Sequence, residues 1–296
     1  MKKYINLQLF AAAENTTVTT DLEPGISIDC VSKLTGNIDE LKKVLGITDM
    51  EVMNAGTTIK IYKLEQVNTP AQVGEGEEIT LTKVTRKVAR TVELALNKYR
   101  RNTTAEAIQK VGRNAAINQT DAVVVTNIQK DIKKLFYDIL LTGTGVATGT
   151  TLQSTMAAVW GKMQETFEDT DATPIYWAST QDVAEYLGNA QLTMQQTFGM
   201  SYVIDFIGLG TLIVSPRIPK GKVVGTAKEN LRGAYIPANT GDVAKTFGLT
   251  SDSTGFVGMA HFPVSGNATV DTLLMSGVVF YPELLDGVIV GTITGA

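Results

Sequence analysis

One long amphipathic helix limits the folds open to this chain more than any other feature of its sequence. Between residues 121 and 141 apolar side chains recur at steps of three and four, which is typical of a helix that buries one continuous stripe. The stripe consists of Val124, Ile128, Ile132, Leu135, Phe136 and Ile139, and the opposite face carries Gln129, Lys130, Lys133 and Lys134. Gly143 follows as a suitable stop. Such a helix would be roughly 30 Å long at about 1.5 Å per residue, so we expect a rigid spine in an elongated molecule.

A second constraint comes from two segments with a period of two. Residues 58–64 and 79–85 alternate apolar and polar side chains as strands do. Between them lies a turn-rich acidic segment, residues 68–78, with Glu75, Glu77 and Glu78. We therefore predict an extended β-hairpin with an acidic tip. Because an isolated two-stranded hairpin is marginal in water, it needs a surface to lie on, either on its own domain or on another subunit.

The segment from residue 83 to residue 101 is strongly basic, with Glu93 as its single acid. Three interpretations stay open: a solvated face, a contact with the acidic tip of a neighbouring subunit, or an inner surface facing the phosphates of packaged nucleic acid. The aromatic interleaving of a single-strand binder is missing, since Tyr99 stands alone. Our candidates for contacts between subunits are Glu75, Glu77, Glu78, Lys83, Arg86, Lys87, Arg90, Arg100 and Arg101.

The rest of the chain mixes helices and strands. A polar arm over residues 1–25 precedes a short helix within residues 30–45, and Thr103 and Thr104 are expected to cap another short helix. Further helices are predicted over residues 151–167 and 181–189, and strands over residues 174–178, 202–207, 211–214, 223–224, 268–275, 278–280 and 287–293. We expect Trp160 and Trp177 in the core. Helices beside a mixed or antiparallel sheet indicate an α+β fold.

Residues that could carry catalysis are scarce. One histidine (His261) and one cysteine (Cys30) are too few for a zinc site built on these ligands. No G-x-S-x-G motif accompanies His261, so we interpret it as a packed or half-exposed structural residue. The glycine-rich segment 143–149 follows a helix where a nucleotide loop would open one. We expect no catalytic residue, no cofactor and no metal, and hence no enzyme; a hydrolase or nucleotide-binding enzyme is the alternative outside structural proteins.

The composition limits which partners this chain can be expected to bind. The formal charge of −4 argues against bulk nucleic-acid binding, while 44% apolar and 19% charged residues describe a chain with a real core. No stretch approaches the roughly 20 apolar residues needed to cross a bilayer, so no membrane partner is expected.

The order of these parts resembles a tailed-bacteriophage major capsid protein of the HK97 fold, over nearly the full length. Residues 57–95 resemble the extended loop of that family, and Phe136–Gly145 resembles the end of its spine helix with the glycine turn. Further similar segments are Asn6–Phe10 (typical of phages of Gram-positive hosts), Pro174–Ala178, Ser215–Gly221 and Val278–Ile293.

The resemblance implies a domain organisation. It assigns residues 1–50 to an N-terminal arm and short helix, 51–95 to the extended loop, 96–150 and 256–296 to a peripheral domain with the spine helix, and 151–255 to an axial domain. It further implies hexamers and pentamers that close into an icosahedral head enclosing double-stranded DNA, assembled in the host cytoplasm and found in the virion.

The same resemblance implies partners. A portal protein and non-specific contact with packaged DNA are expected, and the lack of a long N-terminal extension favours a separate scaffolding protein. An encapsulin-like shell of a cellular nanocompartment is the alternative within this fold. A phage tail-tube protein would instead need a mostly β chain without a spine-length helix.

Overall fold

The structure is a computed structural model of the 296-residue chain, and it describes most of the chain outside the N-terminal region. The described residues are 16–17, 49–67, 83–168, 171–188, 194–197, 200–238, 240–251 and 255–295. The short helix predicted within residues 30–45, the acidic segment 68–78 and the strand residues 79–82 lie outside them. Our statements about the arm and the hairpin tip therefore stay predictions.

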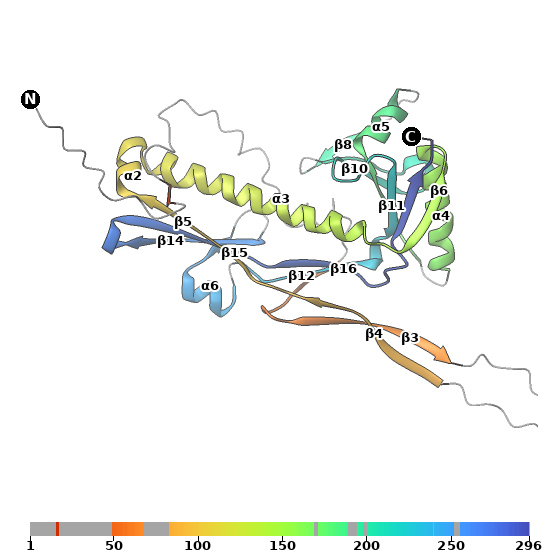
Figure 1. The fold of residues 1–296 in the computed structure, drawn as a ribbon, viewed down its shortest axis with the longest axis horizontal. Helices are drawn as coiled ribbons and strands as arrows, with labels where there is room; N and C mark the ends of the chain where they lie inside the picture. The colour runs from red at the N-terminus through yellow and green to blue at the C-terminus, as the bar shows by residue number, and fades with distance from the viewer. Residues whose placement is uncertain are drawn as a thin grey trace, which may run out of the picture.

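The predicted spine helix is confirmed as α3 (Thr120–Leu140), which runs along the long axis of the molecule (Figure 1). A π-helical stretch (Asn114–Gln119) leads directly into it and follows helix α2 (Ala105–Val111). The Thr104 hydroxyl caps α2, as expected, by accepting a hydrogen bond from the Ala107 amide. After α3 the chain turns at Gly143, where a Cβ atom would lie 2.4 Å from the Val288 carbonyl oxygen. Only glycine allows this close approach.

The buried side of α3 differs from the predicted stripe in two places. Leu135, expected in the stripe, is exposed, whereas Gln129, expected on the solvent side, is buried. The reason is that α3 contacts elements of several sheets instead of lying on one flat surface. The Phe136 ring shows this: its centroid lies 5.7 Å from that of Trp177 and 5.4 Å from that of Phe280, two residues on different sheets.

A seven-stranded mixed sheet lies at one end of α3 (Figure 1). Its order is β6-β17-β11-β7-β10-β9-β8, with β6 Gly145–Gly149, β7 Pro174–Ser179, β8 Gln195–Thr197, β9 Met200–Val203, β10 Thr211–Ser215, β11 Lys222–Ala227 and β17 Ile289–Ile293. Both faces of its centre are covered. Trp177 belongs to the same apolar cluster as α3, and Tyr176 points to the opposite cluster.

Helices α4 (Leu152–Thr166) and α5 (Thr180–Leu187) confirm the two helices predicted here. Helix α4 contacts β6, β11 and β17, while α5 contacts β7 and β10. The expectation that Trp160 is a core residue is wrong, because it lies on the outer side of α4 and is 39% exposed. Trp177 is fully buried, as predicted.

Two smaller sheets lie along the length of α3. The five-stranded sheet has the order β1-β5-β15-β14-β13, and the three-stranded sheet the order β16-β12-β2. Their strands are β1 Thr16–Thr17, β5 Asn97–Thr104, β13 Thr250–Ser251, β14 Val257–Val264, β15 Thr269–Ser276, β2 Asp49–Val52, β12 Leu231–Tyr235 and β16 Val278–Pro282, with helix α6 (Gly241–Phe247) between β12 and β13. The elements that were not predicted are helix α6 and strands β1, β2, β5, β6, β8, β12, β13 and β14, of which β6 lies within the glycine-rich segment 143–149. Strands β6 and β17 belong to the predicted peripheral domain, and β7 belongs to the predicted axial domain. Because all three lie in one sheet, this sheet crosses the predicted boundaries at residues 150 and 255. The division into domains stays a prediction.

The strand predicted over residues 202–207 is only partly right. Strand β9 ends at Val203, and the chain reverses through left-handed backbone at Asp205 (φ 56°) and Ile207 (φ 51°). Phe206 is buried between them, and its ring packs against Tyr186 at 5.4 Å. We attribute the unusual backbone to the burial of Phe206, because a β-branched residue such as Ile207 is strained at positive φ and its conformation must be held by the surrounding packing.

Candidate assembly hairpin and the polar network at the spine helix

The predicted hairpin is formed by β3 (Thr58–Val67) and β4 (Lys83–Glu93), which extend away from the body of the molecule (Figure 1). The strands pair antiparallel, with one irregularity between Ile61 and Tyr62. A β-bulge of this kind increases the local twist of a ribbon. At its root the hairpin is fixed, because Leu94 is fully buried and its amide donates to the Thr57 carbonyl at 3.0 Å.

Apolar side chains lie exposed along the hairpin. Tyr62 is paired with Val88 across the strands, and Val88 is 50% exposed. Val84, further along β4, is also exposed. The guanidinium of Arg86 lies 3.6 Å from the centroid of the Tyr62 ring, a cation–π contact that covers part of this face. The rest of this apolar surface needs a partner to leave water.

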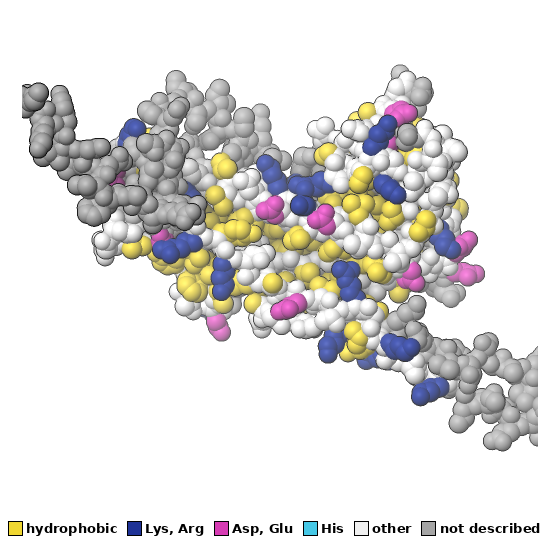
Figure 2. All heavy atoms as spheres, viewed as in Figure 1, with side chains coloured by type: hydrophobic (Ala, Val, Ile, Leu, Met, Phe, Trp, Pro, Cys, Tyr) yellow, Lys and Arg dark blue, Asp and Glu magenta, His cyan; other side chains and the backbone are white. Residues whose placement is uncertain are grey.

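The hairpin strands are also strongly basic. They carry six cations and two acids, namely Lys60, Lys63, Lys83, Arg86, Lys87, Arg90, Glu65 and Glu93. The structure thus brings four of the predicted contact candidates together on one projecting ribbon, and Figure 2 shows Lys and Arg side chains gathered there. Glu75, Glu77 and Glu78 lie outside the described residues.

The last two contact candidates, Arg100 and Arg101, face opposite sides of β5. Arg100 is 70% exposed, and its Nε donates to Oδ2 of Asp271 on the neighbouring strand β15 at 2.9 Å. Arg101 is only 12% exposed and forms an ion pair with Asp121. Arg101 is therefore the weakest of the contact candidates, because its guanidinium is engaged within its own chain.

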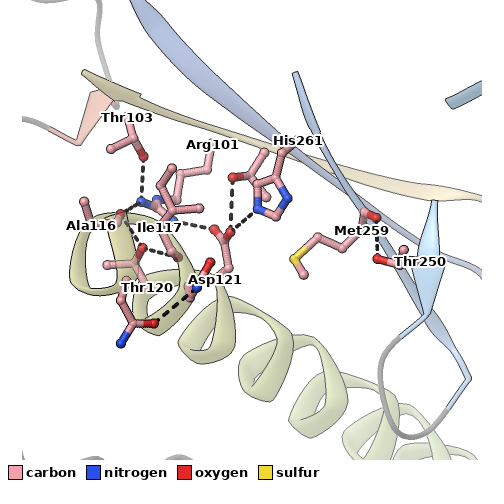
Figure 3. Close-up of polar contacts among 12 residues, drawn as sticks. Arg101, Thr103, Ala116, Ile117, Thr120, Asp121, Thr250, Met259 and His261 are labelled. Carbon is pink, nitrogen blue, oxygen red and sulfur yellow. Dashed lines mark hydrogen bonds and ion pairs between the residues drawn. The ribbon is translucent and has the colours of Figure 1, made fainter. Parts of the chain in front are cut away.

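Asp121 is the centre of a polar network that also includes Arg101, Thr103, His261 and Thr272 (Figure 3). Its carboxylate, 2% exposed, lies 2.7 Å from His261 Nε2 and accepts a hydrogen bond from the Thr272 hydroxyl at 3.3 Å. Arg101 donates to the Thr103 hydroxyl at 2.7 Å and to the Ala116 carbonyl at 2.6 Å. The network therefore ties the first turn of α3 to strands β5, β14 and β15.

Burial and charge act in opposite directions on Arg101. Desolvation lowers the pKa of its guanidinium, and the adjacent Asp121 carboxylate raises it. A buried charge is tolerated only where it is paired and hydrogen-bonded, and both ions of this pair meet that condition. His261 is the structural, partly exposed histidine that the sequence suggested. The role of Asp121 was missed, because an acid in the first turn of a helix is an ordinary cap signal.

The described residues also bear on metal binding and on membrane insertion. Within them no group of three or more His, Cys, Asp or Glu side chains is placed to hold a metal ion. Of the helices in those ranges, none is long and apolar enough to cross a membrane.

No family model matches the chain, and no curated protein matches its sequence. Solved structures do match. The capsid asymmetric unit of cyanophage A-1(L) is 12% identical with a TM-score of 0.58, over 94% of this chain and 98% of that one. The capsid structure of cyanophage P-SCSP1u is 7% identical with a TM-score of 0.58, over 92% of each chain.

A third similar structure is the holo-SrpI encapsulin complex from Synechococcus elongatus PCC 7942, which is 12% identical with a TM-score of 0.55, over 91% of this chain and 92% of that one. At such identities the likeness shows the fold. The chain has the α+β HK97-like capsid fold, as its sequence predicted.

Proposed function

We propose that this chain is the major capsid protein of a tailed bacteriophage, a shell protein without catalytic activity. It assembles as hexamers and pentamers into an icosahedral head around double-stranded DNA. The observation that carries the proposal is the match along nearly the whole length of two cyanophage capsid structures. The projecting hairpin supports it, because its exposed apolar and basic face suits a contact between copies.

In this proposal the hairpin lies on a neighbouring subunit. Its basic residues Lys83, Arg86, Lys87 and Arg90 would contact acidic groups of that neighbour, among them the tip residues Glu75, Glu77 and Glu78. The whole chain has a net charge of −4. Because strands β3 and β4 of the hairpin carry six cations and only two acids, the remainder of the chain is acidic. Complementary charge of this kind fixes the register of an interface more than it adds affinity.

The other expected partners belong to the same proposal. They are a separate scaffolding protein, a portal protein and the packaged DNA, with assembly in the host cytoplasm and a final place in the virion. Residues 151–255 would form the axial domain at the centre of each capsomere, and residues 96–150 and 256–296 the peripheral domain.

An encapsulin-like compartment shell is the second candidate, because an encapsulin complex has a similar fold. The contents of the particle distinguish the two. We expect particles isolated after co-expression with the neighbouring genes to contain nuclease-protected DNA and to carry a portal. Shells that hold a cargo enzyme, and that lack both nuclease-protected DNA and a portal, would favour an encapsulin-like compartment shell.

A further inference from the structure

Strand β1 covers only part of one edge of β5. The two strands pair in parallel at two positions, Thr16 with Asn102 and Thr17 with Thr103. On its other side β5 pairs with β15 along its whole length. Among the described residues no strand lies beside the first edge at Asn97–Arg100, and these four residues are exposed. An edge of this kind presents unpaired backbone N–H and C=O groups, which a further strand can join.

The register of β1 determines which residues would continue this strand. Each residue of β1 lies opposite the β5 residue 86 positions further along the chain, 16 opposite 102 and 17 opposite 103. The same register places Glu14 opposite Arg100, and Ala12 opposite Lys98. Partners in register on parallel strands point to the same face of a sheet. Residues 11–14 would therefore lie along the uncovered edge of β5.

The charges of the two segments are complementary. Exposed cations commonly protect the edge of a sheet from other strands, and Lys98 and Arg100 have such positions on β5. Glu14 is the only charged residue within residues 4–20, and the register brings it directly opposite Arg100 and diagonally opposite Lys98. Arg100 uses two of its five guanidinium donors on Asp271, so others remain for Glu14. Opposite charges paired across strands stabilise a sheet.

An apolar cavity lies at the end of the same edge. In the register of β1, Phe10 falls opposite Leu96, the residue that precedes β5. Leu96 packs against a small apolar cluster and forms one wall of a cavity of about 360 Å³. The other apolar walls include Ile236, Ala238, Val243, Leu249 and Met275. An aromatic ring on these walls would remove apolar surface from water, which stabilises the pairing of a short strand.

We propose that residues 11–14 of the chain's own arm continue β1 along Asn97–Arg100, and that the ring of Phe10 covers the cavity beside Leu96. The occupant is the arm of the same chain, because β1 belongs to it and residue 15 alone separates the two segments. The arm is then held on its own subunit, and the hairpin remains the element that reaches a neighbour. Because the inference concerns a single subunit, it does not depend on the proposed function.

Disulfide cross-linking of the full-length chain, with Cys30→Ala to remove its only thiol, tests this register. Neighbouring strands lie about 4.8 Å apart, which is within the range of Cα distances that a disulfide spans. Ala12→Cys with Lys98→Cys should therefore form a disulfide within one chain as the main product of mild oxidation. Ala13→Cys with Lys98→Cys is the matched control and should form little, because residue 13 points to the opposite face.

Equal cross-linking of the two pairs, or no cross-linking of either, would overturn the proposal. A disulfide between two chains would place the arm on β5 of a second copy, and would overturn its assignment to the same subunit. Non-reducing electrophoresis separates these products, and the masses of the linked peptides identify the two cysteines.

Hydrogen exchange of the unsubstituted chain repeats the test without new cysteines. The amides of residues 11–14 that point toward β5 should exchange at least about tenfold more slowly than in a synthetic peptide of residues 1–20. Phe10→Ala should remove most of this protection, whereas Gln8→Ala, beyond the cavity in the same register, should retain it. Exchange as fast as in the peptide would contradict the proposal, and unchanged protection in Phe10→Ala would contradict the role given to its ring.

Discussion

The Nε2 atom of His261 lies 2.7 Å from Oδ2 of Asp121, although the two residues are 140 positions apart in the sequence. This contact joins strand β14 to the first turn of the spine helix, and the ion pair of Asp121 with Arg101 joins the same turn to β5. The single histidine of the chain thus acts as part of the frame that fixes α3 on its sheet.

A double-mutant cycle measures that contact. We expect Asp121→Asn and His261→Gln to destabilise the fold by less together than the sum of the single changes, with a coupling of about 1 kcal/mol. Urea unfolding of the four proteins provides the free energies. Strict additivity would show that the contact does not contribute to stability.

Arg100 and Arg101 form a matched pair for a second prediction, because both are paired with an aspartate and differ in burial. Arg101→Ala leaves the buried Asp121 carboxylate without its cation and should cost about 3–5 kcal/mol. Arg100→Ala removes a side chain that is 70% exposed and leaves the buried Asp271 carboxylate with its hydrogen bond from Asn102, so it should cost less, about 1 kcal/mol. Chemical unfolding at neutral pH compares the two, and similar losses would contradict the account of the network.

Lys133 gives a prediction for pH. Its folded-state pKa of about 8 lies below the unfolded value of about 10.4. Between these values the unfolded chain binds more protons, so the stability of the fold should rise with pH. Lys133→Gln should stabilise the subunit at pH 7, by about 1 kcal/mol after allowance for the partial exposure of Lys133, and should flatten the rise. Thermal unfolding at pH 7 and pH 9.5 shows both effects, whereas a less stable variant would contradict the direction of the pKa shift.

The exposed apolar face of the hairpin provides a prediction about assembly. Val88→Asp places a charge at a half-exposed position, so the subunit should keep its stability within about 0.5 kcal/mol. Assembly should be impaired, because the charge would have to be buried at the neighbouring subunit. Circular dichroism checks the fold and light scattering the assembly. Val146→Asp, at an exposed position of β6, is the matched control.

The acidic tip can be tested separately. Reversing Glu75, Glu77 and Glu78 to Lys should leave the subunit folded and impair assembly, if the tip contacts a basic surface of a neighbour. Neutral Gln replacements at the same positions should have a weaker effect, because they remove attraction without adding repulsion. Shells formed normally by the Lys variant would show that the tip makes no such contact.

Local patterns in the sequence were enough for the spine helix, the hairpin and the helices α4 and α5. The steps of three and four in α3 and the alternation in β3 do not depend on distant residues. Strand β5 was missed because its formation depends on a distant segment. Asn97–Thr104 is polar and charged, and it is a strand because β15 pairs along its whole length. Gln129 and Leu135 were assigned to the wrong sides of α3, since their burial depends on how the sheets surround the helix.

The polar network shows the same limit. Arg101, Asp121 and His261 come from three separate segments, and no spacing in the sequence indicates that they meet. Arg101 was therefore placed among the contact candidates because the residues near it in the sequence are basic. The contact of the Arg217 guanidinium with the Lys130 carbonyl oxygen could not be predicted either, because the two residues are 87 positions apart in the sequence.

Negative-stain electron microscopy of the purified chain, alone and co-expressed with its neighbouring genes, would show whether the chain builds a shell. We expect closed shells, or rings of five and six subunits, in at least one of these preparations. A uniform monomer or small oligomer under every condition would contradict a shell function for this chain.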